Sequence, residues 1–411
     1  MTAILLVIIY LAFISLGLPD SLLGAAWPVM QSDLAAPLET AGFLFMTIAG
    51  GTIISSLFSG KLLKRFGTGN VTFVSVLMTA GALLGFYFAP SVVWFVICAI
   101  PLGLGAGAVD TGLNDYVAIN YKAHHMSWLH CFWGVGATLG PIIMAQFIMG
   151  ENAWRSGYFV ISGLQFALVI LLLFTLPLWN RVTKNRNITV KGVAKETNEV
   201  IHVEEEKDLK PLQIKGVKLA LTSFLFYCGV EATLGLWGSS FLVNVKGVSA
   251  ATAAGWVSLY YAGITVGRFL TGFITFKMTN RTLIRGGQIM ALFGAIILIL
   301  PLPSIFSLVG FIIVGVGLAP VFPCMLHETP TRFGKKHSQT IMGYQMAVAY
   351  TGTTFLPPLL GFIASHSTIG IFPMYLLTFV GVMLLSSEKL NSLLKMKILG
   401  KRNDSSSNVM S

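Results

Sequence analysis

Long apolar runs recur along the chain and are separated by short polar segments. A helix needs about 20 mostly apolar residues to cross the hydrocarbon core of a bilayer. Only helices or closed barrels satisfy every backbone group in lipid, and runs of this length are too long for barrel strands. The pattern predicts an all-α membrane protein with twelve spanning helices at residues 3–30, 38–63, 70–89, 91–119, 126–149, 154–179, 214–244, 250–276, 283–302, 304–328, 338–364 and 368–390.

A polar segment, residues 180–213, interrupts this pattern after the sixth predicted helix. It is rich in Lys and Glu, which is typical of a solvated linker, and a regulatory or partner-binding role is the alternative. We therefore expect two six-helix halves, residues 1–179 and 214–390, a cytoplasmic linker between them, and a cytoplasmic tail over residues 391–411.

Glycines in three pairs of predicted helices repeat at a nearly constant offset, which indicates an internal duplication. Two pseudo-symmetric halves with a solute site between them near the midplane are a known transporter architecture. The matched pairs are Gly24 and Gly235, 211 positions apart, and Gly51 and Gly263, Gly60 and Gly272, and Gly103 and Gly315, each 212 apart.

Composition and charge agree with a membrane protein. Only 10% of the residues are charged, against about 25% in soluble proteins. The net charge is +11, but basic residues such as Lys61 and Lys64 fall mainly in loops on one predicted side. This positive-inside pattern predicts that both termini lie in the cytoplasm. We expect a multi-pass protein of the plasma membrane. We expect no nucleic-acid partner, and we expect a monomer in the bilayer.

The chain lacks the sequence signals of an enzyme or a metal site. Its four cysteines lie inside apolar runs, without the Cys or His spacing of a metal site or a disulfide framework. No phosphate-binding loop or nucleophile motif is present. We therefore expect no catalytic activity, no cofactor and no bound metal.

Three carboxylates lie well inside the predicted helices: Asp20, Asp110 and Glu231. A charge at the centre of a bilayer costs about 3 kcal/mol on insertion scales, and low dielectric disfavours the charged form. A carboxylate that meets water on each side in turn can take a proton from one side and release it to the other. These acids are therefore candidates for proton coupling. The alternative is that each acid pairs with a cation, such as Arg268, and only holds helices together.

Neutral polar and aromatic side chains in the same helices suit the hydroxyl groups and C–H faces of sugars. Each one alone is equally consistent with core packing or with an interface belt, but together they favour a polar, uncharged solute. His130 is a further candidate, either as a proton relay near neutral pH or as an interfacial residue. The other predicted solute-binding residues are Asn114, Trp133, Tyr227, Trp237, Tyr260, Tyr261 and Gln345.

Two charged pairs are candidates for a cytoplasmic gate. We expect Arg268 to pair with Glu328 as a strut on the cytoplasmic side, with direct solute contact by Arg268 as the alternative. Asp115, near the cytoplasmic end of the fourth predicted helix, is expected to face Arg65 in a similar way.

The chain resembles the major facilitator superfamily and, within it, the fucose–galactose–glucose proton symporter family. The resemblance implies the two-half fold of that superfamily and makes Asp20 and Asp110 the substrate- and proton-linked groups. One departure is Lys64, which stands where the superfamily's loop signature has an acid. The motifs that carry the resemblance are Gly17-Leu18-Pro19-Asp20, Gly103-Leu104-Gly105 with Asp110 and Asn114, Gly134-Val135-Gly136-Ala137, and Gly315-Val316-Gly317 with Phe322-Pro323.

These observations favour a transporter that moves a sugar or similar small polar solute together with protons by alternating access. The alternative is a proton-coupled efflux antiporter for drugs or metabolites, because Gly136, Gly140 and Pro141 echo the fifth-helix signature of such antiporters. A receptor would need a sizeable soluble output module, which this sequence lacks.

Overall fold

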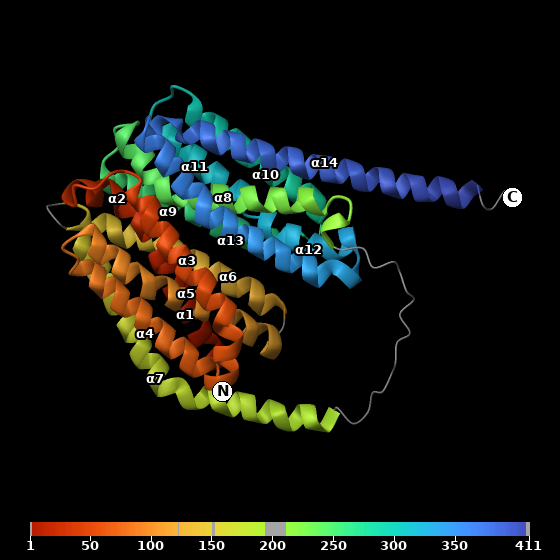
Figure 1. Ribbon diagram of the computed structural model, residues 1–411, viewed down its shortest axis with the longest axis horizontal. Coiled ribbons are helices and arrows are strands. Elements are labelled where there is room, and N and C mark those ends of the chain that lie inside the picture. The colour runs from red at the N-terminus through yellow and green to blue at the C-terminus, as the bar shows by residue number, and fades with distance from the viewer. Residues whose placement is uncertain (1, 122, 150–152, 194–210, 276, 408–411) are drawn as a thin grey trace. The chain divides into compact units, whose positions relative to one another are not determined.

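The computed structural model describes residues 2–121, 123–149, 153–193, 211–275 and 277–407. Within these residues the secondary structure is helical, and no strand is formed (Figure 1). Twelve helical segments are long and apolar enough to cross a membrane. The fold class expected from the apolar pattern is therefore confirmed.

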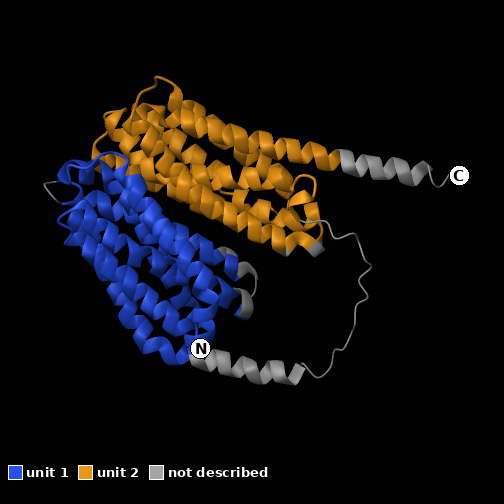
Figure 2. Cartoon of the chain, in the orientation of Figure 1, with its two compact units in different colours: residues 1–208 blue, residues 209–411 orange. Residues whose placement is uncertain are grey.

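Contacts between residues divide the chain into two compact units, Met1–Asp208 and Leu209–Ser411 (Figure 2). Unit 1 contains α1 (Thr2–Asp20), α2 (Leu22–Asp33), α3 (Thr40–Phe66), α4 (Thr68–Tyr87), α5 (Val92–Asn120), α6 (Ala123–Phe147) and α7 (Trp154–Val193). Unit 2 contains α8 (Val217–Asn244), α9 (Ala250–Ile274), α10 (Asn280–Ile299), α11 (Ile305–Leu318), α12 (Val321–Phe333), α13 (Lys335–Ser365) and α14 (Phe372–Ser407), with short 3-10 turns at Pro211–Gln213 and Ile369–Ile371.

Two predicted helices are each divided in two. The first span consists of α1 and α2, which meet at Ser21, and the tenth consists of α11 and α12, which meet at Ala319 and Pro320. A proline inside a helix removes one backbone hydrogen bond and its ring crowds the preceding turn. Pro19 and Pro320 lie at these two breaks, so the apolar pattern gave the spans but missed the interruptions.

Two helices extend by three turns or more beyond the predicted spans. The sixth span was predicted to end at residue 179, but α7 continues to Val193. The last helix, α14, continues through most of the predicted tail to Ser407. Residues 194–210 of the predicted linker, which include Glu204, Glu205 and Glu206, lie outside the described residues.

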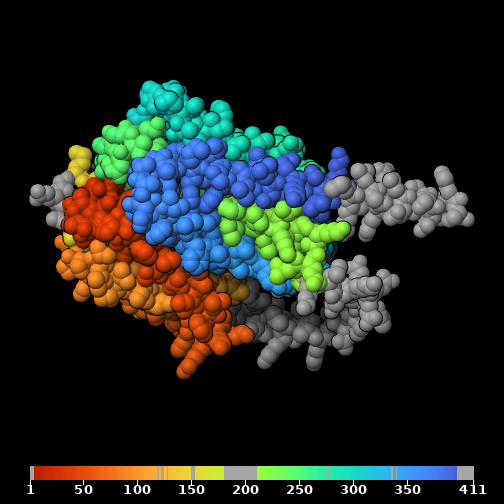
Figure 3. Space-filling view, turned by 45° about the horizontal axis from the view of Figure 1, so that its top comes forward, coloured from red at the N-terminus to blue at the C-terminus, as the bar shows by residue number. Residues whose placement is uncertain are grey.

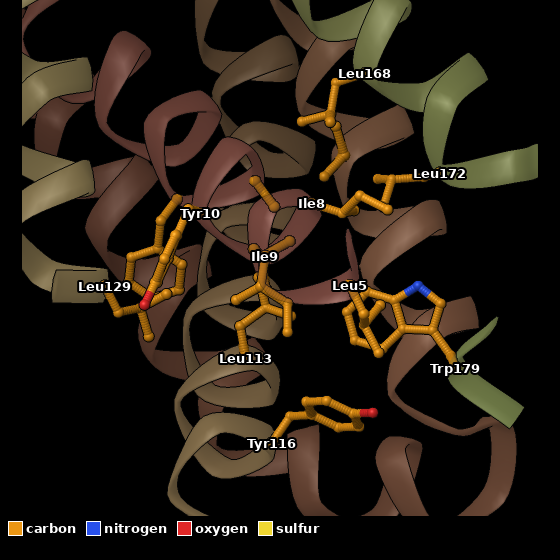
Figure 4. Packing of buried hydrophobic residues seen from close by; sticks show 14 of the residues in the cluster. Leu5, Ile8, Ile9, Tyr10, Leu113, Tyr116, Leu129, Leu168, Leu172 and Trp179 are labelled. Atoms are coloured by element: carbon orange, nitrogen blue, oxygen red, sulfur yellow. The ribbon is translucent and has the colours of Figure 1, made fainter. Parts of the chain in front are cut away.

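The core of unit 1 forms where the buried face of α1 meets its neighbours. Leu5, Ile8 and Ile9 are fully or almost fully buried, and their spacing of three and four residues places them on one helical face. They pack with Leu113 of α5 and Leu172 of α7 (Figure 4). These contacts hold the N-terminal half of α1 in position.

Glycines allow α1 and α6 to approach closely. A Cβ atom added to Gly17 would meet the backbone carbonyl of Trp133, and one added to Gly136 would meet the carbonyl of Ile14. Small residues at such crossings let two helix backbones come into contact inside a membrane. The crossing places Trp133 beside the end of α1, where Asp20 lies.

Large apolar side chains remain exposed on both units, which suits a protein surrounded by lipid. Leu57 is 78% exposed, Phe174 77% and Leu385 71%. Figure 3 shows one face of the molecule in a space-filling view coloured by residue number. Large exposed apolar patches would be unfavourable in water.

Candidate functional site

Asp20 is the last residue of α1 and lies near the middle of the first span, Ile4–Asp33. Its side chain is exposed, although the residues around it in the sequence are mostly buried. The indole nitrogen of Trp133 in α6 donates a hydrogen bond to Asp20 Oδ2 at 2.7 Å. The carboxylate therefore has one neutral donor and an open side.

The helix break beside Asp20 is supported by side chains that replace the backbone bonds lost at two prolines. Pro19 has no N–H, so the carbonyl of Ser15 four residues earlier loses its helical donor. Gln165 of α7 donates to that carbonyl at 2.8 Å through Nε2. Thr79 of α4 donates to Gln165 Oε1 at 2.7 Å, and all three side chains are buried.

A second replacement bond joins the start of α2 to α6. Pro141 leaves the carbonyl of Ala137 without its helical donor. The hydroxyl of Ser21 donates to this carbonyl at 2.9 Å. Side chains therefore satisfy both freed carbonyls, those of Ser15 in α1 and Ala137 in α6, which stabilises the helix break at Asp20.

Asp110 lies in α5 and is half-buried. Asn114, one turn later, donates from Nδ2 to Asp110 Oδ1 at 2.9 Å and to the Asp110 carbonyl at 3.0 Å. Within the described part of the chain, neither Asp110 nor Asp20 forms an ion pair with Lys, Arg or His.

Glu231 differs from the other two acids because a cation compensates its charge. Arg268 Nη2 of α9 lies 3.0 Å from Glu231 Oε1 and 3.3 Å from Oε2. The same nitrogen donates to the hydroxyl of Tyr227 at 3.1 Å. Glu231 therefore pairs with a cation, which is the alternative stated for the three acids in the sequence analysis.

Neither predicted gate pair is formed among the described residues. Arg268 pairs with Glu231, one helix away in the same unit, while Glu328 accepts from Arg332 Nε at 3.2 Å within α12. The i, i+4 spacing on one helix brings Arg332 to Glu328 without any movement of another helix.

The second predicted gate pair involves exposed residues. The guanidinium of Arg65 lies over the ring of Phe66, 5.3 Å from its centroid, and Asp115 is exposed. Among the residues that the structure describes, Asp115 and Arg65 form no ion pair with each other.

Three predicted solute ligands are instead buried in helix contacts of unit 2. Trp237 is fully buried, and its indole nitrogen donates to the carbonyl of Pro357 at 2.7 Å. Tyr260 is also fully buried, and its hydroxyl donates to the Glu231 carbonyl at 3.1 Å. Gln345, 1% exposed, accepts from Thr329 at 2.9 Å. In this structure their polar groups hold helices together, and solute binding by these three residues stays a prediction.

The remaining predicted ligands are distributed between the acids and the packing. Trp133 and Asn114 each donate to a carboxylate, as described above, and both are half-buried. Tyr227 is fully buried beside Arg268, and the hydroxyl of Tyr261 lies against Gly235. His130 stands edge-on to Phe13, with ring centroids 5.9 Å apart.

Sequence reasoning missed the buried residues that hold the break at Asp20, namely Ser15, Ser21, Thr79 and Gln165. A signal for the two carbonyls that lose their helical donors was present: Ser15 lies four residues before Pro19, and Ala137 lies four residues before Pro141. The donors could not be identified, since they come from elsewhere in the chain. No group of three or more metal-ligating side chains is found in the described residues.

The model of the Major Facilitator Superfamily matches residues 9–357 of this chain. The chain belongs to the Major Facilitator Superfamily. It is therefore a multi-pass membrane transporter and not an enzyme, and the resemblance to this superfamily stated from its motifs is confirmed.

Individual relatives of this superfamily member include sugar transporters. The chain is 23% identical to the glucose/mannose transporter GlcP of Bacillus subtilis over 389 residues, which cover 91% of this chain and 92% of GlcP. It is 26% identical to the Bypass of stop codon protein 6 of Saccharomyces cerevisiae over 407 residues, which cover 92% and 80% of the two chains.

The fold also matches solved transporter structures. A crystal structure of a D-xylose–proton symporter superposes with a TM-score of 0.70 at 14% identity, over 94% of this chain and 96% of that one. At this identity the likeness concerns the fold alone.

Proposed function

We propose that this transporter moves a sugar or similar small polar solute together with protons, by alternating access, across the plasma membrane. In this proposal the chain acts as a monomer with both termini in the cytoplasm. Asp20 is the principal proton-binding group, and Asp110 with Asn114 assists it.

The observation that carries the proposal is the exposed carboxylate of Asp20 near the middle of a span. A carboxylate at this depth is unfavourable against lipid and is normally found facing a water-filled pathway, a partner or a bound ion. Its one described hydrogen-bond donor is the neutral indole of Trp133. An open acid without a described cation beside it can gain and lose a proton as water reaches it from either side.

Protonation would change what Asp20 can offer to a solute. The ionised carboxylate only accepts hydrogen bonds, whereas the protonated form donates one and still accepts others. Sugar hydroxyl groups both donate and accept, so the protonated acid suits them better. Binding of a proton and binding of a sugar would thus favour each other, which is the requirement for symport.

The named relatives support this class of solute. GlcP is called a glucose/mannose transporter, and a structure of similar fold is called a D-xylose–proton symporter. We therefore choose D-glucose, D-mannose and D-xylose as the first probes.

Uptake into proteoliposomes with an imposed pH gradient tests the proposal. We expect the wild-type protein to concentrate at least one probe sugar, and Asp20→Asn to lose concentration while it still equilibrates the sugar. Asp115→Asn is the matched control: it makes the same change on an exposed acid that has no described ion pair, and it should concentrate sugar normally.

Three results would contradict the proposal. Asp20→Asn could concentrate sugar as the wild type does, a sodium gradient could replace the pH gradient completely, or the pH gradient could drive probes outward. The last result would favour the efflux antiporter.

A further inference from the structure

Unit 2 carries an ion pair at a depth where a transporter is expected to meet its solute. Glu231 is near the middle of α8, Val217–Asn244, and Arg268 reaches it from α9. The side chains of Arg268 and Glu231 are 14% and 16% exposed, whereas Tyr227 beside them is fully buried. The pair is therefore set into the unit but remains open at one edge.

The geometry of the pair leaves acceptor capacity on the carboxylate. A single nitrogen, Arg268 Nη2, makes both contacts to Glu231, at 3.0 and 3.3 Å, so these two contacts are not the two parallel bonds of a fork. An ionised carboxylate has about four lone-pair sites on its two oxygens. The shared Arg268 donor and the hydroxyl of Tyr227, which also donates to Glu231, occupy about half of this capacity, so the oxygens of Glu231 can accept two further O–H groups.

The surroundings hold the carboxylate in one place. The hydroxyl of Tyr227 accepts from the same Arg268 nitrogen at 3.1 Å, and the hydroxyl of Tyr260 donates to the backbone carbonyl of Glu231 at 3.1 Å. The ring of Phe322 lies 5.9 Å from that of Tyr227. A fixed carboxylate beside aromatic rings can order two neighbouring hydroxyl groups and pack against C–H groups.

We propose that Glu231, held by Arg268 and Tyr227, recognises two adjacent hydroxyl groups of an uncharged polyhydroxy solute. This inference rests on the proposed function and names its solute class more closely. The role differs from that of Asp20, because the charge of Glu231 is already compensated and its oxygens accept hydrogen bonds without a proton being taken up. An anionic solute would be repelled by the carboxylate at this position.

Deoxy sugars provide the test, because each one removes a single hydroxyl group. Binding of D-glucose and its 1-, 2-, 3-, 4- and 6-deoxy forms is measured on purified protein in nanodiscs, without a pH gradient. A hydrogen bond to a charged group is worth roughly 10- to 100-fold in affinity. We expect two adjacent deoxy positions to weaken wild-type binding by about this factor, and D-gluconate to bind more weakly than D-glucose.

The variant Glu231→Gln should bind D-glucose about 10-fold more weakly and should no longer distinguish those two deoxy sugars from D-glucose. Glu328→Gln is the matched control, since Glu328 is also an acid of unit 2 paired with an arginine, and it is 20% exposed. It should retain the wild-type pattern of deoxy sugars.

A second variant separates recognition from folding. Glu231→Gln leaves Arg268 without its counter-charge, which can destabilise a buried site. The double variant Glu231→Gln/Arg268→Gln removes both charges, and we expect it to remain monodisperse and to be equally indifferent to the two deoxy positions.

Two results would overturn the inference alone: the same deoxy penalties in wild type and in both variants, or D-gluconate binding to wild type as tightly as D-glucose. If wild type binds and transports none of the neutral sugars, the proposed function fails and the inference fails with it.

Discussion

The first helical spans of the two units carry acids at matching depth, but the acids have different partners. Asp20 and Glu231 are 211 positions apart in the duplicated pattern. Asp20 accepts from the indole of Trp133, whereas Glu231 lies 3.0 Å from the guanidinium of Arg268. Duplication has preserved an acid at mid-span while its charge is left open in one unit and compensated in the other.

The sequence difference behind this contrast is small. The position 212 before Arg268, the offset that relates these helices, is Ser56 in α3. The hydroxyl of Ser56 donates to the carbonyl of Gly107 at 3.3 Å and supplies no charge. One arginine therefore decides whether the acid of that unit has a cation.

The hydrogen-bond donor that α6 supplies to Asp20, Trp133, also has no equivalent in unit 2. Gly136 meets the carbonyl of Ile14, and Gly352 meets the carbonyl of Leu225. Ile14 and Leu225 are 211 apart, so Gly136 and Gly352, 216 apart, occupy corresponding places. By the same offset the counterpart of Trp133 is Ala349, which has no hydrogen-bond donor in its side chain.

Asp110 is likewise replaced in unit 2. Its counterpart, 212 positions later, is Phe322, which packs with Phe224 and Tyr227 at centroid distances of 5.0 and 5.9 Å. Among the three mid-span acids, the two of unit 1 have no described cation, and the one of unit 2 is compensated and lies among aromatic rings. This difference fits the proposals that Asp20 gains and loses a proton and that Glu231 accepts hydrogen bonds from the solute without taking up a proton.

The largest expected effect comes from removal of the compensating cation. Arg268→Met would leave Glu231 uncompensated at mid-span, and breaking a buried pair in this way costs about 3 to 5 kcal/mol. We expect a large loss of thermal stability in detergent, and substantial recovery in Arg268→Met/Glu231→Gln. The corresponding Ser56→Ala should change stability little. Equal effects of Arg268→Met and Ser56→Ala would remove the basis of the comparison.

The next effect concerns one helix contact in each unit, in which glycine and leucine occupy opposite sides in the two units. Gly140 lies against the carbonyl of Leu18 in unit 1, whereas the side chain of Leu356 lies against Gly229 in unit 2. Gly140→Leu should destabilise unit 1 by about 1 to 3 kcal/mol through overpacking. Gly81→Leu, at a glycine of unit 1 with open space where a Cβ would lie, should cost less in the same thermal unfolding assay. Equal costs of the two variants would contradict the overpacking at Gly140.

A smaller effect is expected at the helix break. Gln165→Leu would leave the Ser15 carbonyl without a side-chain donor, at a cost of about 1 to 3 kcal/mol, near the lower end if water replaces the amide. In a Pro19→Ala background the backbone N–H at position 19 can bond to that carbonyl. Gln165→Leu should then cost less, as judged by the midpoint of thermal unfolding. The same cost in both backgrounds would show that Gln165 does not serve the proline.

The smallest effect is expected where the predicted gate pair is not formed. Asp115→Asn and Arg65→Gln should each change the free energy of unfolding by less than about 0.5 kcal/mol, as is usual for exposed positions. A double-mutant cycle between the two should give no coupling. A clear coupling energy would restore the pair as a gate.

The sequence alone determined the spans, the membrane class, the duplication and the depth of the three acids. This was possible because a bilayer imposes a fixed length of apolar helix and makes each buried charge conspicuous. The same pattern could not show the breaks at Ser21 and at Pro320, since a proline within a membrane helix either ends it or is accommodated by donors from other helices.

Only the tertiary structure decided which group each acid contacts. Arg268 was expected to reach Glu328 and instead reaches Glu231, and the indole nitrogen of Trp237 donates to the carbonyl of Pro357. These pairings depend on how helices far apart in sequence cross and on which residue faces the crossing. A linear pattern fixes how deep a side chain lies in the membrane, but the choice of partner is a property of the packed unit.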